Sequence, residues 1–199
     1  MMDDQNSLKP PEVLQRIKVD TAALGFQMAS EPLTGALLRT LAATKPAGRF
    51  LELGTGTGVS TAWLLDGMDE ASHLISVEND ADCIAVAKQY LGNDHRVSFH
   101  TEDAAVLLAT LPKQQFDFIF ADTWAGKYTH LEDTLQLLKP GGLYVIDDML
   151  PQSSGPEGHA AKVLKLIAAL ENNAALVLTK MKWSSGIIIA ACVESHSKL

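Results

Sequence analysis

The chain of 199 residues contains only two cysteines, Cys83 and Cys192, and they are far apart in the sequence. Closely spaced cysteines, which would indicate a zinc site or a redox motif, are absent, so buried and reduced thiols are the simplest interpretation. A chain of this length buries roughly 70% of its unfolded surface when it folds. No disulfide or structural metal is therefore needed for stability.

Positive charge is scarce. Sixteen Lys and Arg stand against 24 Asp and Glu, a net charge of −8, which disfavours a nucleic-acid partner. Long apolar runs are also lacking: the longest, residues 187–193, is too short to cross a bilayer, and no basic segment leads into an apolar one at the start. We expect no membrane partner and a cytoplasmic protein.

Repeats and low-complexity tracts are missing too, so we expect one domain over residues 1–199. Short apolar runs recur along it, and most are continuously apolar, as in strands that are covered on both faces. These runs occupy residues 49–53, 73–78, 96–100, 116–121, 143–147, 175–181 and 186–193.

Apolar residues at helical spacing lie between these runs. Four such patterns occupy residues 33–41, 84–91, 131–138 and 163–170, and a further helix is expected near residues 13–17. Ser30 and Asp80 are the expected N-caps of the first two, and Pro140 should end the third.

The alternation of strands and helices predicts an α/β fold, a seven-stranded and mostly parallel sheet with helices on both faces. Only four residues separate the last two runs, which is too few for a crossover helix. One of these strands should therefore run antiparallel. Ligands of such sheets bind beyond the carboxyl ends of the strands, where the strand order reverses.

The first run ends in the sequence ELGTGTG, which leads into a helix. Glycines there allow a sharp turn and a close approach of the backbone to a ligand. A dinucleotide fingerprint would need glycine at Val59, so the nicotinamide pattern is not met. A tight loop that the fold requires is the alternative interpretation.

The second run ends in Glu78, whose carboxylate could accept hydrogen bonds from ribose hydroxyls or only cap the next helix. After the third run, Asp103 and Ala104 could border an adenine ring.

These motifs resemble class I S-adenosylmethionine-dependent methyltransferases, and more narrowly the catechol O-methyltransferase-like family with its bacterial relatives, from about residue 28 to residue 142. The resemblance implies that the glycine loop and Ser60 hold the methionine part of S-adenosylmethionine, that Glu78 holds its ribose and that Trp124 covers its adenine. The cofactor-binding residues expected are Glu52, Gly54, Thr55, Gly56, Gly58, Ser60, Glu78, Asp103, Ala104, Asp122 and Trp124.

The segments FDFIFAD and KPGGLYVIDD are similar to the family's fourth and fifth strands, which implies a metal site of Asp122, Asp147 and Asp148. The residues agree physically, because these carboxylates follow adjacent strands and Mg²⁺, Mn²⁺ or Ca²⁺ prefers oxygen ligands. Asp147 and Asp148 are consecutive, so both can be ligands only if the chain leaves strand geometry there.

The family's catalytic lysine aligns with Ala125 in this chain. Lys127 is the nearest replacement, so Asp122 and Lys127 are the expected catalytic residues, with His130 and His159 as weaker candidates for a base. The resemblance implies a hydroxylated small molecule as methyl acceptor, with residues 1–30 contributing to its site or to a homodimer contact. A cofactor-binding protein without transfer activity and a nicotinamide-dependent oxidoreductase are the alternatives.

Overall fold

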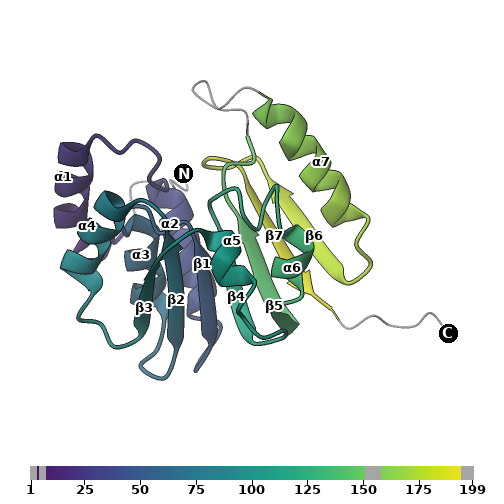
Figure 1. The fold of residues 1–199 in the computed structure, drawn as a ribbon, viewed down its shortest axis with the longest axis horizontal. Coiled ribbons are helices and arrows are strands. Elements are labelled where there is room, and N and C mark those ends of the chain that lie inside the picture. Colours follow the sequence, from purple (N-terminus) through teal and green to yellow (C-terminus); the bar gives the residue numbers. More distant parts are fainter. Residues whose placement is uncertain (1–3, 5–7, 151–157, 194–199) are drawn as a thin grey trace.

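Seven strands form one mixed sheet in the computed structural model, which describes residue 4 and residues 8–150 and 158–193 (Figure 1). The strands are β1 (Arg49–Leu53), β2 (His73–Glu78), β3 (Val97–Thr101), β4 (Phe116–Ala121), β5 (Leu138–Ile146), β6 (Leu176–Met181) and β7 (Ile187–Cys192). The helices are α1 (Leu14–Leu24), α2 (Pro32–Ala42), α3 (Val59–Gly67), α4 (Ala81–Leu91), α5 (Ala104–Leu108), α6 (Leu131–Leu135) and α7 (His159–Glu171).

The strand order is β3-β2-β1-β4-β5-β7-β6. The first five strands are parallel, and β7 runs antiparallel to both of its neighbours, β5 and β6. The predicted fold, including the antiparallel strand near the end of the chain, is confirmed. The order reverses between β1 and β4, so a crevice for ligands is expected at the carboxyl ends of these two strands.

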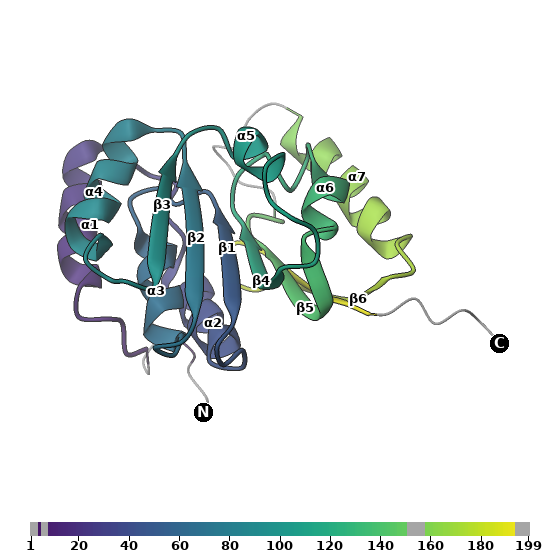
Figure 2. The ribbon, with the colours of Figure 1, turned by 60° about the horizontal axis from the view of Figure 1, so that its bottom comes forward.

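Both faces of the central strands are buried. On β1, Phe50 belongs to a core cluster with side chains of α1 to α4, while Leu51 and Leu53 belong to a second cluster with α5 and α7. Figure 2 shows the two helical layers on opposite sides of the sheet. Successive strand residues point to opposite faces, so a strand between two layers must be apolar on both, as the continuous apolar runs predicted.

Helix α1 packs on its own domain. Leu14 and Ile17 are buried, and the hydroxyl of Tyr90 on α4 donates to Asp20 Oδ2 at 2.7 Å. The hydroxyls of Thr21 and Thr57 form a hydrogen bond at 2.8 Å, which connects the helix to the glycine loop. The apolar face of α1 is thus buried within the chain.

Two predicted element boundaries are wrong. Helix α6 ends at Leu135, and Leu138 begins β5, because the leucine spacing continues from a short helix into a strand. Ser30 does not cap α2: Glu31 stands at the N-cap, and Pro32, whose fixed φ suits the first helical position, begins the helix. Asp80 is confirmed as the cap of α4, where it accepts from the backbone of Asp82 and Cys83.

None of the helices in the described part of the chain has both the length and the apolar character needed to span a membrane.

Candidate functional site

The loop between β1 and α3 needs glycine for its backbone geometry. Gly54 and Gly56 have φ angles of +99° and +51°, which residues with a side chain rarely adopt. A Cβ on Gly54 would lie 3.0 Å from the carbonyl oxygen of Asp122, and one on Gly56 would lie 3.1 Å from the Phe26 ring. Gly58 occupies the N-cap of α3. The loop backbone therefore lies against β4 and leaves the amides at the start of α3 available.

A buried network of polar side chains supports this loop from the protein interior. Glu52 has no solvent exposure, and its Oε2 accepts from Thr61 Oγ1 at 2.5 Å and from Ser76 Oγ at 2.6 Å. Burial raises the pKa of Glu52 to about 7, against the lowering effect of hydrogen bonds from Ser60, Ser76 and Thr61. Thr55 also bonds Ser76, at 2.6 Å. Glu52, Thr55 and Ser60 thus face the protein interior here, and cofactor contact by these three stays a prediction.

The carboxylate of Glu78, at the end of β2, is hydrogen-bonded to the glycine loop. Its Oε2 accepts from the backbone N–H of Gly56 at 2.8 Å, and its Oε1 accepts from those of Asn79 and Asp80 at 2.9 and 3.0 Å. The side chain is fixed by three backbone donors and still borders a cavity. Glu78 therefore presents an oriented negative charge beside the glycine loop.

A cavity of about 440 Å³ opens along the carboxyl ends of β1, β2 and β4. It brings together five of the expected cofactor residues, namely Gly54, Glu78, Asp103, Ala104 and Trp124. Asp103 also caps α5 by accepting from the N–H of Ala105 at 2.7 Å. A ligand with polar groups and a flat apolar end fits this lining, because it includes the carboxylates of Glu78 and Asp103 and the exposed indole of Trp124.

Trp124 belongs to an aromatic cluster that links this cavity to α7. The Nζ of Lys162 lies 4.5 Å from the centre of the Trp124 ring, and the Tyr128 ring meets Trp124 edge-on at 5.7 Å. The Tyr128 hydroxyl is hydrogen-bonded to His159 Nε2 at 2.9 Å. Burial, with the charge of Asp148 adding to it, raises the pKa of Tyr128 to about 12. One face of the first turn of α7 therefore covers the loop after β4.

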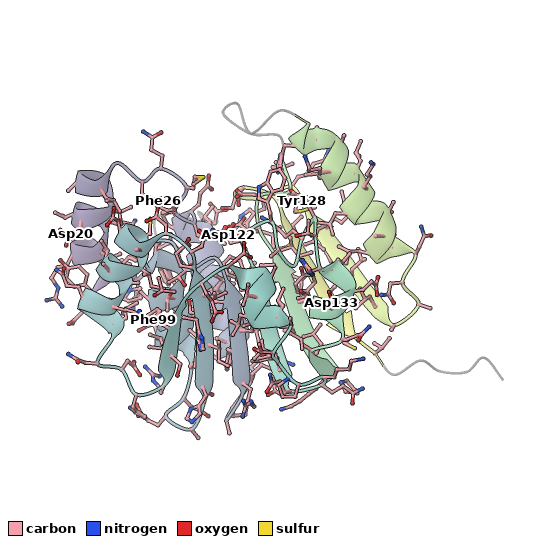
Figure 3. The ribbon with its side chains drawn as sticks, viewed as in Figure 1. Asp20, Phe26, Phe99, Asp122, Tyr128 and Asp133 are labelled. Carbon is pink, nitrogen blue, oxygen red and sulfur yellow. The ribbon has the colours of Figure 1, made fainter. Side chains whose placement is uncertain are left out.

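The three aspartates converge as predicted. One ligand oxygen from each of Asp122, Asp147 and Asp148 lies within 4.8 Å of the others. Asp122 directly follows β4, and in Figure 3 it lies at the upper edge of the sheet between Phe26 and Tyr128. Asp148 has a φ of +60°, so the chain leaves strand geometry there, and both consecutive carboxylates can face one site.

Burial dominates the electrostatics of this cluster. It raises the pKa of Asp122 well above its usual value, with the charge of Lys127 opposing and those of Asp147 and Asp148 adding to the effect. Burial raises the pKa of Asp147 to about 6, against a hydrogen bond from Ser185. The cluster thus favours a positive charge.

Lys127 supplies part of that charge. It is only 4% exposed, its Nζ lies 3.8 Å from Asp122 Oδ1, and it donates to the carbonyl oxygen of Asp147 at 3.1 Å. Although it stands two residues beyond the expected lysine position, the turn at Gly126, with a φ of +91°, brings it back to the carboxylates. Ala125, at the expected position, is buried and borders the cavity.

Two serines that contact the aspartates were not identified from the sequence. Ser30 donates to Asp122 Oδ2 at 3.2 Å, and Ser185 donates to Asp147 Oδ1. Ser30 was interpreted as a helix cap, and Ser185 as part of a short turn. Each lies far from its aspartate along the chain, so only the tertiary structure brings the pairs together.

The donor set suits a hard divalent cation. The aspartate cluster, made of Asp122, Asp147 and Asp148, is the only group of three or more acidic side chains in the described residues that is close enough to share one ion. Burial makes the negative charges of Asp122 and Asp147 unfavourable unless a cation neutralises them. Mg²⁺ prefers oxygen ligands and retains part of its water shell, which three carboxylates at one edge of an open site allow.

Comparisons with known proteins identify the family of the chain. The sequence profile of the O-methyltransferase family matches residues 4–187. A catechol O-methyltransferase of Niastella koreensis is 33% identical over 126 residues, which are 60% of this chain and 57% of that protein. A protein of Mycolicibacterium vanbaalenii named as an O-methyltransferase is 32% identical over 123 residues, 59% of this chain and 54% of its own length. The matched segment thus spans little more than half of these relatives.

Solved structures share the fold. The O-methyltransferase TomG from Streptomyces achromogenes, in complex with SAM, superposes with a TM-score of 0.83 at 22% identity, covering 96% of this chain and 94% of that one. An O-methyltransferase from Bacillus cereus, in complex with SAH, gives a TM-score of 0.83 at 20% identity and covers 95% and 94%.

Proposed function

This chain belongs to the O-methyltransferase family, and we propose that it transfers a methyl group from S-adenosylmethionine to a hydroxyl of a small molecule with the help of a divalent cation. The proposal rests on one observation: the cofactor cavity and the aspartate cluster lie next to each other. The cavity beside the glycine loop borders Thr123 and Ala125, and the aspartate cluster begins at Asp122, the residue next to Thr123. A cofactor in the cavity would therefore end where an acceptor can bind.

The cofactor is proposed to lie along the cavity, with its methionine part over the backbone of the glycine loop. Glu78 would accept hydrogen bonds from the ribose hydroxyls, and Asp103, Ala104 and Trp124 would border the adenine. We expect affinity in the micromolar range for S-adenosylmethionine or its demethylated product. Trp124 is 46% exposed, so covering an adenine would bury apolar surface that now faces water.

Asp122, Asp147 and Asp148 would hold the cation, with Mg²⁺ as the expected ion and Mn²⁺ or Ca²⁺ as substitutes. A bound divalent cation supplies positive charge that favours the deprotonated form of an acceptor hydroxyl. The aspartates position this charge next to the open end of the cofactor cavity.

Lys127 is the residue that we propose to receive the acceptor's proton or to stabilise its negative charge. In the transfer itself, the acceptor oxygen forms a bond to the methyl carbon while the carbon–sulfur bond breaks and its electron pair stays on sulfur. The hydroxyl proton must leave, and Lys127, whose Nζ lies 3.8 Å from Asp122 Oδ1, can receive it only when its amine is neutral; as an ammonium, Lys127 would instead stabilise the negative charge of the acceptor oxygen.

Family membership excludes the nicotinamide-dependent alternative. A cofactor-binding protein without transfer activity is disfavoured by Lys127, because the amine that Ala125 seemed to remove is present at the aspartates. The proposal includes a homodimer, for which exposed Leu164 on α7 and Val177 on the adjacent β6 are the supporting observation. The cytoplasmic location stays a prediction.

The proposal is tested by incubating the full chain with isotopically labelled S-adenosylmethionine and a panel of vicinal diols, with Mg²⁺ or with a chelator. We expect labelled methyl ether and stoichiometric demethylated cofactor, with at least a tenfold loss in chelator and in Asp147→Asn. Asp82→Asn, an exposed carboxylate on α4 outside the cavity, is the matched control and should keep full activity. Activity that survives chelation would remove the cation from the proposal, and failure to bind S-adenosylmethionine would refute the proposal itself.

A further inference from the structure

The turn between β6 and β7 lies at the aspartate cluster, although it is distant from it in sequence. Because β7 is antiparallel to β5, the start of β7 meets the end of β5, with Ile188 paired to Ile146. The contact continues beyond the strands. Leu150 N–H donates to the carbonyl oxygen of Ser185, and Met149 N–H donates to that of Gly186, both at 2.9 Å. The backbone therefore holds Ser185 beside the segment that carries Asp147.

The hydrogen bonds of Asp147 are unevenly divided between its two oxygens. Oδ1 accepts from the hydroxyl of Ser185 and, at 2.8 Å, from the backbone N–H of Asp148. No described residue donates to Oδ2. The side chain is only 1% exposed, so a carboxylate satisfied on one oxygen leaves the second oxygen for another partner.

We propose that Ser185 is a positioning residue that occupies Oδ1 of Asp147 and so presents Oδ2 to the divalent cation. The inference rests on the proposed function, because it assigns a role toward the cation proposed there. Hydrogen bonds to a ligating carboxylate fix its orientation and limit it to one coordinating oxygen. Asp147 would then bind the cation through Oδ2 alone.

Hydrogen bonds and close packing hold the turn in place. The hydroxyl of Ser184 donates to Glu31 Oε2 at 2.6 Å and lies 3.0 Å from the hydroxyl of Thr34, which is fully buried on α2. Gly186 has a φ of +88°, and a Cβ there would come within 2.5 Å of the backbone nitrogen of Leu150. Ser184 thus anchors the turn to α2, while its neighbour Ser185 points to the carboxylate.

A purely structural role for Ser185 makes a different prediction from a positioning role. If its hydroxyl only satisfied a buried carboxylate, its loss would lower stability and leave cation affinity unchanged. If it orients Oδ2, cation affinity must fall even at temperatures where the variant is fully folded.

The experiment measures Mn²⁺ binding to the full chain by electron paramagnetic resonance and calorimetry, without an acceptor. We expect Ser185→Ala to weaken Mn²⁺ binding by about 10-fold to 100-fold, as is usual when a hydrogen bond to a metal ligand is lost. Ser185→Thr keeps the hydroxyl and should restore the affinity. Ser98→Ala, which removes the hydroxyl of an exposed serine on β3, is the matched control and should bind like the unchanged chain. Binding of the demethylated cofactor checks that each variant is folded.

Two outcomes would overturn the inference in distinguishable ways. If Asp147→Asn abolishes Mn²⁺ binding but Ser185→Ala binds as tightly as the unchanged chain, Ser185 does not position the ligand and the proposed function stands. If the unchanged chain binds no Mn²⁺, the cation falls from the proposed function, and the role of Ser185 falls with it.

Discussion

Glu52 makes the free energy of unfolding depend on pH. Its pKa is raised from 4.5 to about 7 in the folded protein, so between these values the folded state retains a proton that the unfolded state has lost. Stability from this group is therefore fully present below pH 4.5 and is lost as the pH rises to about 7, by about 3 kcal/mol in total.

We predict that Glu52→Gln removes this dependence, because the amide keeps the shape of the protonated acid and has no proton to lose. Urea denaturation between pH 5 and pH 8 measures it, as the difference between the variant and the unchanged chain. The difference cancels the contributions of Asp122 and Asp147, whose pKa values are raised too. Parallel curves for the two proteins would contradict the prediction.

Glu78 is predicted to contribute to cofactor affinity through its charge. Glu78→Ala removes an acceptor of charge-assisted hydrogen bonds, each worth about 1.5–3 kcal/mol, so affinity for the demethylated cofactor should fall at least tenfold. Calorimetry measures it, and Glu70→Gln, an exposed carboxylate outside the cavity, is the control. Because Glu78 also accepts from Gly56, thermal unfolding must show that the variant retains its fold. Unchanged affinity would remove Glu78 from the site.

At the scale of secondary-structure elements, the connection between β4 and α6 is important because it contains Lys127. We predict that Lys127→Met, which keeps the aliphatic stem, lowers the rate of methyl transfer and alters its dependence on pH, while cofactor affinity stays the same. Rates across pH with saturating cofactor provide the measurement, and Lys113→Met, outside the site, is the control. A rate and pH profile like those of the unchanged chain would show that Lys127 takes no part in proton transfer.

Element types could be predicted from the sequence where one physical signal dominates. Continuous apolar runs identified the strands because both faces of the sheet are covered. The four-residue separation of the last two strands predicted that one of them is antiparallel, and the structure shows that it is β7. The boundary at Leu138 could not be found this way, since leucines spaced as in a helix occur here across a helix and the following strand.

The candidate site, too, could be predicted from the sequence only in part. The convergence of Asp122, Asp147 and Asp148 followed from parallel strands ending at one edge. The contact of Lys127 could not be predicted, because it depends on the path of a loop through Gly126. The contacts of Ser30 and Ser185 join segments far apart in the sequence, and no local pattern records such pairs.

At the scale of the whole molecule, the position of the site follows from topology. The chain builds β1, β2 and β3 outward in one direction and then returns to place β4 against the other side of β1. The loops after β1 and β4 consequently separate toward opposite faces of the sheet, and the cavity lies between them. The two core clusters, one for each helical layer, hold these loops in place from both sides.

The place of β7 between β5 and β6 also has a consequence for the order in which the protein can assemble during synthesis. The ribosome completes β6 before β7, yet among the described residues only β7 pairs with β6, and β5 keeps one unpaired edge until residues 187–192 have emerged. A nascent chain that ends short of this point exposes an apolar strand edge, the kind of surface on which chains associate with one another. Asp122 and Asp147, which follow β4 and β5, reach their final environment only when β7 inserts, so the proposed cation site should form in a single step once residues 187–192 have emerged.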